Sequence, residues 1–239
     1  MSGISRRNWL VGGFAAAAGG AVAVKMAARY GLLPPDASGI YGPGTALTYA
    51  ANRILVGNSP AREFSRSQIS KPFVNGDPPK EATFQKLQSN GFLDWRLQVD
   101  GMVSRPATYS LADLKALPAR SQITHLACEE GWSYISEWTG VPLAHVLSNA
   151  GLPPQARYVA YQSIQKDWSD FIDIAEALHP QTLIAYGLNG GDLPVGNGGP
   201  LRLRVPRQLG YKSVKYITRI TVTDRMPKFA GDYSWYAGI

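Results

Sequence analysis

The only cysteine of this chain lies among side chains that could do chemistry. Cys128 ends the apolar run ITHLA (123–127) and is followed by Glu129, Glu130 and Trp132. A thiolate is both a nucleophile and a soft metal ligand, but neighbouring carboxylates raise a thiol pKa, and a single cysteine cannot form an internal disulfide. The surroundings of Cys128 are therefore not those of a self-activated nucleophile.

Three other interpretations of Cys128 are open from the residues alone. Free cysteines are often buried and serve only packing. Zinc binding with His125 is disfavoured, because a spacing of three on a strand places two side chains on opposite faces, and no CxxC or HxxxH motif completes a four-ligand site. A Cys-His hydrolase with His145 or His179 as its base fits the spacing, although no oxyanion-hole motif accompanies it.

A second group of residues, further along the chain, could bind an anion. The segment NGGPLRLRVP (197–206) contains Arg202 and Arg204, and the segment GYKSVK (210–215) adds two lysines. Glycine lets a backbone approach a ligand closely, and arginine and lysine both suit phosphate. The alternation of the two arginines with leucine is equally typical of a half-buried strand with a solvated face, so the pattern alone leaves both interpretations open.

The elements that must position these residues are short and mostly strands. A capping box from Ser110 to Asp113 predicts a short helix that Pro118 ends. Apolar alternation and runs of β-formers predict strands at 95–99, 123–127, 156–163, 182–188, 201–205 and 215–222, and helical spacing predicts helices at 141–151 and 174–178. Many strands with few helices indicate an α+β fold rather than repeated βαβ units.

The composition changes along the chain and indicates four parts. Residues 31–90 are rich in Pro, Gly, Ser and Asn and predict a linker followed by an irregular arm. The regular signals extend over 91–225, where we expect the main folded domain, and 226–239 is expected to be a tail. Residues 1–30 have the character of a targeting segment.

The targeting segment pairs Arg6 and Arg7 with a small, apolar stretch at 11–24. This pattern resembles a twin-arginine export signal, a route that carries folded proteins, usually with an inserted cofactor, to the periplasm. The alternative is an uncleaved N-terminal membrane anchor, although the apolar stretch is shorter than the roughly 20 residues that a spanning helix needs.

The net charge of +7 could suggest a nucleic-acid partner. Four of the 24 basic residues lie in the first thirty positions, which contain no acidic residue, and the remaining 20 stand against 17 acidic residues. The body of the chain is thus nearly balanced, and we expect no nucleic-acid binding.

Taken together and in this order, the motifs resemble the sulfite oxidase family of molybdenum enzymes, specifically its molybdopterin-binding domain. They are Cys-x-Glu-x-Trp-Ser at 128–133, TGVPLAHVL at 139–147, ARYVAYQS at 156–163, ALHPQTL at 177–183, NGGPLR at 197–202 and GYKSVKY at 210–216. Within the family, the pattern is more similar to the bacterial periplasmic branch that contains the protein-methionine-sulfoxide reductase catalytic subunit than to the sulfite oxidases themselves. The resemblance implies a mixed, strand-rich α+β molybdopterin domain. We expect no immunoglobulin-like dimerisation domain of the sulfite oxidase type after Asp224, and therefore a monomer.

Carried over to these positions, the resemblance implies that Cys128 supplies a thiolate to molybdenum, together with two sulfurs of one molybdopterin. Soft thiolate ligation suits such a metal, and a bound cation activates the thiol without any other group. The pterin and its phosphate would be bound by Asn75, Ser163, Asn197, Arg202, Ser213, Val214 and Lys215. Glu130 would be the catalytic proton donor or the group that positions water.

Departures from the family pattern bear on the substrate. Sulfite oxidases have arginines after the cysteine that hold the sulfite dianion, whereas Glu129 and Glu130 here would repel an anion. His125 stands where relatives often carry Arg, and Phe171 is near the position of an active-site Tyr. We therefore expect an exported molybdenum oxidoreductase that transfers an oxygen atom, with two electrons, on a neutral S-oxide or N-oxide. The alternatives are sulfite oxidation and a non-catalytic exported pterin-binding domain.

The electron source is expected to be a second protein. The sequence has no CxxCH motif, and one cysteine cannot tether a c-type haem or hold an iron–sulfur cluster. We expect no haem in this chain and a separate electron-transfer protein, a cytochrome or membrane haem protein, that delivers or accepts the electrons. The oxidised substrate would be a small molecule or a group on another protein.

Overall fold

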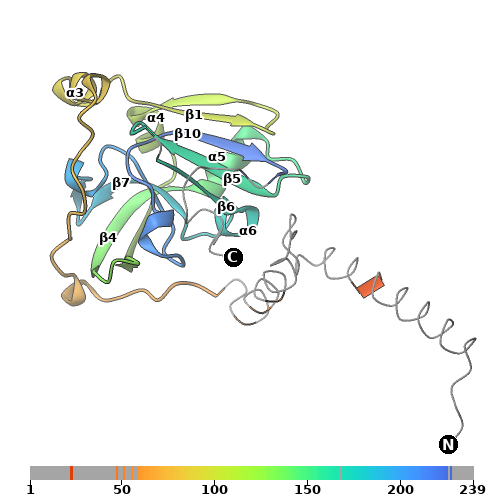
Figure 1. Ribbon diagram of the computed structural model, residues 1–239, viewed down its shortest axis with the longest axis horizontal. Helices are drawn as coiled ribbons and strands as arrows, with labels where there is room; N and C mark the ends of the chain where they lie inside the picture. The colour runs from red at the N-terminus through yellow and green to blue at the C-terminus, as the bar shows by residue number, and fades with distance from the viewer. Residues whose placement is uncertain are drawn as a thin grey trace, which may run out of the picture. The chain divides into compact units, whose positions relative to one another are not determined.

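The computed structural model of the protein describes residues 59–166, 168–225 and 227, together with the isolated positions 22, 23, 47, 51 and 55 (Figure 1). The predicted export signal at 1–30 and tail at 226–239 lie almost entirely outside this part. Among the described residues, no helix has the length and apolar character needed to cross a membrane.

Two five-stranded sheets form the body of the domain. In the first sheet the strand order is β2 (Ala107–Ser110), β1 (Arg96–Gly101), β10 (Ile217–Thr223), β5 (Tyr158–Ser163) and β6 (Ser169–Asp173). Only β1 and β10 pair in parallel, and the other neighbours are antiparallel. The last long strand of the sequence thus lies at the centre of this sheet, as Figure 1 shows.

The second sheet carries the cysteine. Its strand order is β3 (Arg120–Ala127), β4 (Ser133–Pro142), β7 (Leu183–Leu188) and β8 (Gly191–Asp192), and β9 (Arg202–Arg204) also pairs with β7. A two-residue turn of Asn189 and Gly190, both with positive φ, joins β7 to β8. This is the hairpin chemistry that an Asn-Gly pair favours. Cys128 follows β3 directly and begins the turn into β4.

The helices are short and lie mainly between strands: α3 (Ala82–Ser89), α4 (Leu111–Ala116), α5 (Leu143–Ala150) and α6 (Ile174–Ala177), with 3₁₀ turns η1 (Arg66–Gln68), η2 (Val195–Asn197) and η3 (Gly210–Lys212). The predicted capping box is confirmed, because the Ser110 hydroxyl accepts from the Asp113 amide and the Asp113 carboxylate accepts from the Ser110 amide. Helix α5 ends at Gly151, whose left-handed backbone caps it.

The main hydrophobic core draws its side chains from both sheets and from α5. Trp95 directly precedes strand β1 of the first sheet, and Leu97 lies in it. Val141 and Ile184 come from the second sheet and Val146 comes from α5. All five side chains are fully buried. This shared core holds the two sheets in one domain and so fixes the strand ends that reach the site. The mixed, strand-rich α+β fold expected from the sequence is confirmed.

An extended arm precedes α3 and follows the edge of the second sheet. The Gln181 side chain bonds both backbone groups of Ala61, the Phe64 amide donates to the Ile123 carbonyl, and the Ser70 amide donates to the Ile135 carbonyl. In Figure 1 the arm, in orange and yellow, passes beside β4 and climbs to α3. Helix α3 differs from the irregular arm predicted over 31–90, because Pro, Gly and Asn precede it and mask its own helical pattern.

Candidate cofactor and active site

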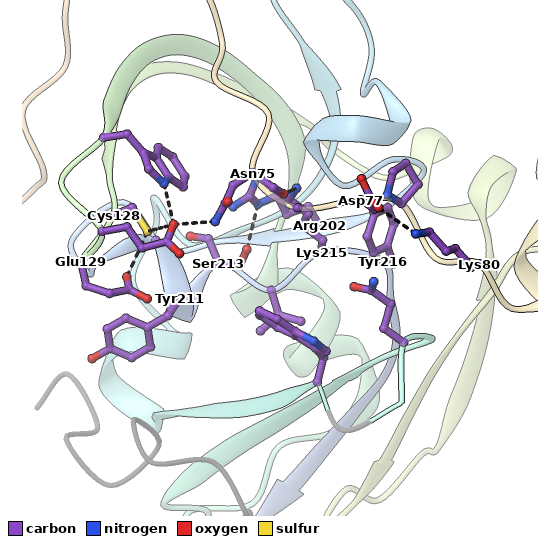
Figure 2. Close-up of a pocket in the computed structure, with 18 of the residues that line it drawn as sticks. Asn75, Asp77, Lys80, Cys128, Glu129, Arg202, Tyr211, Ser213, Lys215 and Tyr216 are labelled. Atoms are coloured by element: carbon purple, nitrogen blue, oxygen red, sulfur yellow. Dashed lines mark hydrogen bonds and ion pairs between the residues drawn. The ribbon is translucent and has the colours of Figure 1, made fainter.

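A cavity of about 850 Å³ lies where the arm, the β3–β4 turn and the η3 loop meet. Its lining is Asn75, Gly76, Asp77, Pro78, Lys80, Glu81, Cys128, Glu129, Glu130, Trp132, Gln165, Trp168, Arg202, Gly210, Tyr211, Ser213, Val214, Lys215 and Tyr216. Figure 2 shows an elongated arrangement, with Cys128, Glu129 and Tyr211 at one end and Asp77, Lys80 and Tyr216 at the other. The cavity therefore has a thiol end and a distal end, with a group of polar side chains between them.

A tight turn presents the Cys128 thiol to this cavity. The Cys128 amide donates to the Trp132 carbonyl, and the amide of Gly131, which has φ +92°, donates to the Cys128 carbonyl. The Cys128 Sγ lies 3.2 Å from a Glu129 carboxylate oxygen. Burial, and then the carboxylates of Glu129 and Glu130, raise the pKa of Cys128 to about 11. The thiol is thus protonated at neutral pH unless a cation binds it, with burial as the larger cause rather than the two acids.

The Glu130 carboxylate is held beside the thiol from two sides. Its Oε2 accepts from Asn75 Nδ2 at 2.8 Å and from Trp132 Nε1 at 2.7 Å, and lies 3.7 Å from Cys128 Sγ. Dashed lines in Figure 2 trace these contacts. An exposed carboxylate fixed in this way can exchange a proton with solvent and deliver it to one place.

Cationic side chains occupy the middle of the cavity wall. The Arg202 guanidinium, almost fully buried, donates to the carbonyls of Ser213 and Asn197. Lys215 Nζ donates to the carbonyls of Asn75 and Gly196, and burial and the charge of Arg202 lower the pKa of Lys215 to about 8. Among the described residues, no carboxylate forms an ion pair with either cation.

Gly198 allows these two cations to approach each other. Its φ is +108°, and a Cβ at this position would lie 2.9 Å from Lys215 Cγ and 3.1 Å from Arg202 Cδ. Any other residue would push the cationic side chains apart and would strain the backbone. The glycine in the NGGPLR motif therefore serves the geometry of the cationic pair.

This donor set fits molybdopterin with its phosphate and metal. Buried cations without a counter-ion are costly unless an anion compensates them. Arg202 and Lys215 would hold the phosphate, and Cys128 would supply the thiolate that a soft metal takes. The alternative of a solvated strand face is wrong, because Arg202 and Arg204 are 4% and 0% exposed.

Seven of the nine predicted site residues line the cavity: Asn75, Cys128, Glu130, Arg202, Ser213, Val214 and Lys215. The two others, Ser163 and Asn197, lie just behind the lining. The Ser163 hydroxyl accepts from the amide of Gln165, which lines the cavity. Asn197 accepts from Arg202 through its carbonyl and donates from its side chain to the Phe73 carbonyl. A cofactor contact by these two residues stays a prediction.

Several lining residues were missed by sequence reasoning. Trp168 and Tyr211 face the cavity from two loops, and Asp77 and Lys80 face it from the arm. Only the position of Tyr211 inside the GYKSVK segment could have signalled it. Trp132 also lines the cavity, whereas Trp138 and Tyr161 are fully buried and do not line it.

Two residues that depart from the family pattern do not line the cavity. Phe171 is buried in strand β6, and the side chain of His125 is exposed on strand β3. His125 nevertheless contributes its backbone carbonyl, which accepts from Arg204. Neither side chain therefore contributes to the cavity wall that the structure describes.

Comparison with known proteins agrees with this site. The family model described as "Oxidoreductase molybdopterin binding domain" matches residues 84–230, which is more than half of the chain. Among solved structures, the sulfane dehydrogenase SoxCD from Paracoccus pantotrophus superposes with a TM-score of 0.54 at 23% identity, covering 56% of this chain and 39% of that one. At that identity, the likeness shows the fold alone.

Curated relatives extend the comparison. A protein of Azospira oryzae, provisionally named protein-methionine-sulfoxide reductase subunit YedZ1, is 36% identical over 76% of this chain and 69% of its own length. The protein-methionine-sulfoxide reductase catalytic subunit MsrP of Xanthomonas campestris is 40% identical over 64% of this chain. The match spans about half, 51%, of that MsrP. The chain therefore belongs to the oxidoreductase molybdopterin-binding domain family, the sulfite oxidase family of molybdenum enzymes.

Proposed function

We propose that this chain is an exported enzyme that reduces a neutral sulfoxide, of which methionine sulfoxide within a protein is the favoured substrate. The observation that carries this proposal is the charge at the thiol end of the cavity. Glu129 and Glu130 lie beside the Cys128 thiol, while the cations Arg202 and Lys215 lie further along the wall. A negatively charged reacting end repels sulfite and admits an uncharged S–O group. The names of the curated relatives support the same class of substrate.

The chemistry divides between the cofactor and this chain. When bound, molybdenum with molybdopterin supplies two-electron transfer coupled to movement of an oxygen atom. Reduction of a sulfoxide to a thioether consumes two electrons and two protons and releases water. Glu130, held by Asn75 and Trp132, is the group placed to pass protons from solvent to the thiol end. Cys128 would supply the thiolate ligand to the metal, and the Trp132 ring lines the same cavity.

The electrons come, in this proposal, from a separate protein. A single cysteine and no CxxCH motif support an external donor, a cytochrome or a membrane haem protein. The twin-arginine pattern at Arg6 and Arg7 supports export to the periplasm, with the signal cleaved or kept as an anchor. We propose that the enzyme acts as a monomer with one cofactor per chain.

Turnover by the loaded chain tests the proposal. The full chain is purified from its native host, its molybdenum content is measured, and rates are normalised to bound metal. A reduced viologen dye serves as electron donor for methionine sulfoxide in a peptide, dimethyl sulfoxide and trimethylamine N-oxide. For sulfite oxidation, an oxidised dye serves as the electron acceptor.

We expect the peptide sulfoxide to be reduced fastest. Sulfite oxidation faster than any sulfoxide reduction would overturn the substrate assignment, and a metal-loaded chain with no turnover would support the non-catalytic alternative.

A further inference from the structure

Arg204 is a buried cation that the proposed chemistry does not use. It lies in the short strand β9, two residues after Arg202, and its side chain is 0% exposed. It does not line the cavity. A fully buried guanidinium is rare unless it is paired or bonded, so its contacts indicate its role.

The contacts of Arg204 connect strand β3 to the loop that contains Ser213. Its Nη2 donates to the His125 carbonyl at 2.7 Å and to the Thr124 hydroxyl at 3.2 Å, near the end of the strand that leads into Cys128. Its Nη1 lies 3.5 Å from the hydroxyl of Ser213, which lines the cavity. One planar side chain thus spans from the thiol-bearing strand to the loop beside the cationic pair.

Both arginines of β9 form hydrogen bonds with Ser213. Its carbonyl accepts from Arg202 Nε at 2.8 Å, and its hydroxyl accepts from the Val205 amide at 3.1 Å and faces Arg204. Displacement of Arg204 would therefore release the Ser213 hydroxyl on one side and the His125 carbonyl on the other. Because Ser213 lines the cavity, the effect would reach the cofactor site without a direct contact to it.

The charge of Arg204 is uncompensated in the described part of the chain. No carboxylate forms an ion pair with it there, and its Nε atom has no hydrogen-bond partner. Arg202 and Arg204 both lie over the Trp138 ring, at 5.6 and 5.3 Å from its centre. Burial, and then the like charge of Arg202, lower the pKa of Arg204 to about 9.

Lys212 provides the contrast, since it is equally buried but paired. Its Nζ donates to the Asp170 carboxylate at 2.6 Å and to the Phe171 carbonyl at 2.8 Å. The chain thus compensates one buried cation internally and leaves the neighbouring cluster of Arg202, Arg204 and Lys215 with excess positive charge. Such a cluster is stabilised only when an anion binds close to it.

We propose that Arg204 is a positioning residue of the cofactor site, which fixes the Cys128-bearing strand to the Ser213 loop and adds positive charge behind the groups that hold the anionic cofactor. The proposal rests on membership of the molybdopterin-binding family and not on the identity of the substrate. It predicts that Arg204 strengthens cofactor binding more than it stabilises the cofactor-free chain.

The test compares three variants of the full chain: Arg204→Met, Arg204→Lys and the matched control Lys212→Met. Each is purified from a host that makes molybdopterin and from a host that does not. Thermal unfolding midpoints are measured for both forms, and the bound pterin is quantified by fluorescence after dialysis. The difference between the loaded and cofactor-free midpoints reports the cofactor-linked stabilisation.

For Arg204→Met we expect the cofactor dissociation constant to rise by about tenfold or more and the difference between midpoints to shrink. Arg204→Lys should lie between this variant and the wild type, because lysine keeps the charge but not the planar fork. Lys212→Met should lower both midpoints together and leave their difference unchanged. Equal lowering of both midpoints in Arg204→Met, with wild-type pterin retention, would overturn the proposal.

Two further outcomes are also decisive. If Arg204→Met does not fold, then Arg204→Lys decides the question, and wild-type pterin retention by Arg204→Lys would overturn the proposal. Reduction of the peptide sulfoxide per bound molybdenum is measured in parallel. Loss of pterin with unchanged turnover per metal supports the role of Arg204, whereas absent turnover in a fully loaded wild type concerns only the proposed substrate.

Discussion

Asn75 donates a hydrogen bond of 2.8 Å to Glu130, a residue 55 positions further along the chain. The arm and the β3–β4 turn thus build one carboxylate site together. The same Glu130 oxygen accepts from Trp132 Nε1, so its direction is set from both sides. The Asn75 carbonyl in turn accepts from Lys215, which connects the acidic end of the cavity to its cationic middle. One arm residue therefore bridges the two chemical regions of the site.

The first prediction concerns Glu130 as the proton-delivering group. Glu130→Gln should lower kcat on a peptide sulfoxide by about a hundredfold, because the amide cannot donate the proton that product formation requires. Molybdenum and pterin contents should be unchanged. Steady-state rates normalised to bound metal measure the effect, with Asp192→Asn, an exposed carboxylate outside the cavity lining, as the control. Wild-type kcat in Glu130→Gln would remove this residue from the mechanism.

The second prediction separates Asn75 from the rest of the arm. Asn75→Ala removes the side-chain bond to Glu130 but keeps the backbone carbonyl that Lys215 uses. We expect kcat to fall by about tenfold, a smaller loss than in Glu130→Gln, since the carboxylate remains but is less well oriented. Steady-state rates normalised to bound molybdenum measure the effect. Unchanged kcat would show that the bond to Trp132 is sufficient.

The third prediction uses the thiol of the cofactor-free chain. Because burial and two carboxylates raise the pKa of Cys128 to about 11, the thiolate fraction near neutral pH is small. The rate of alkylation by iodoacetamide should therefore keep rising beyond pH 9 and level off near pH 11. Glu129→Gln should move the curve to lower pH, because it removes a negative charge 3.2 Å from the sulfur. A plateau below pH 9 in the wild type would contradict this account of the site.

Much of the fold could be predicted from local signals. The Ser110 and Asp113 capping box, the Asn189-Gly190 turn and the alternation at 95–99 each act over a few residues, and the structure contains each of them. Strand β4 was not predicted, although it is long. It is buried on both faces along much of its length, so it lacks the apolar and polar alternation that marks a half-exposed strand.

Site residues that lie in recognisable motifs could be predicted, whereas those that the fold brings in from other segments could not. Cys128, Arg202 and Lys215 stand in recognisable segments, and all three line the cavity. Trp168 lies in the loop between β5 and β6, outside the motifs, and only the fold shows that it lines the cavity. The burial of Arg204 could not be predicted, because arginines that alternate with leucines are equally typical of a strand with one solvent-exposed face.

The fourth prediction concerns the buried pair of Lys212 and Asp170. Lys212→Met should destabilise the cofactor-free chain by about 3–5 kcal/mol, because it leaves the Asp170 carboxylate buried and unpaired. The double variant Lys212→Met with Asp170→Leu should recover most of that loss. Urea unfolding followed by tryptophan fluorescence measures both. Equal instability of the single and double variants would show that the pair acts through packing rather than charge.

The fifth prediction concerns Trp168, which lines the cavity and is 59% exposed. An exposed aromatic ring in a cavity wall is suited to contact with a large substrate. Trp168→Ala should raise KM for a peptide that contains methionine sulfoxide by about tenfold and leave KM for dimethyl sulfoxide unchanged. Leu178→Ala, at an exposed residue outside the cavity, serves as the control. A parallel rise for both substrates would place Trp168 in cofactor binding instead.

The most direct test of the central claim is X-ray absorption at the molybdenum edge of the loaded wild type and of Cys128→Ser, beside molybdenum and pterin contents per chain. The account predicts close to one molybdenum and one pterin per wild-type chain. Any molybdenum that the Cys128→Ser variant retains should have one fewer sulfur neighbour than in the wild type. An identical sulfur shell in both proteins, or a wild type without molybdenum and pterin, would contradict the assignment of Cys128 as the metal ligand.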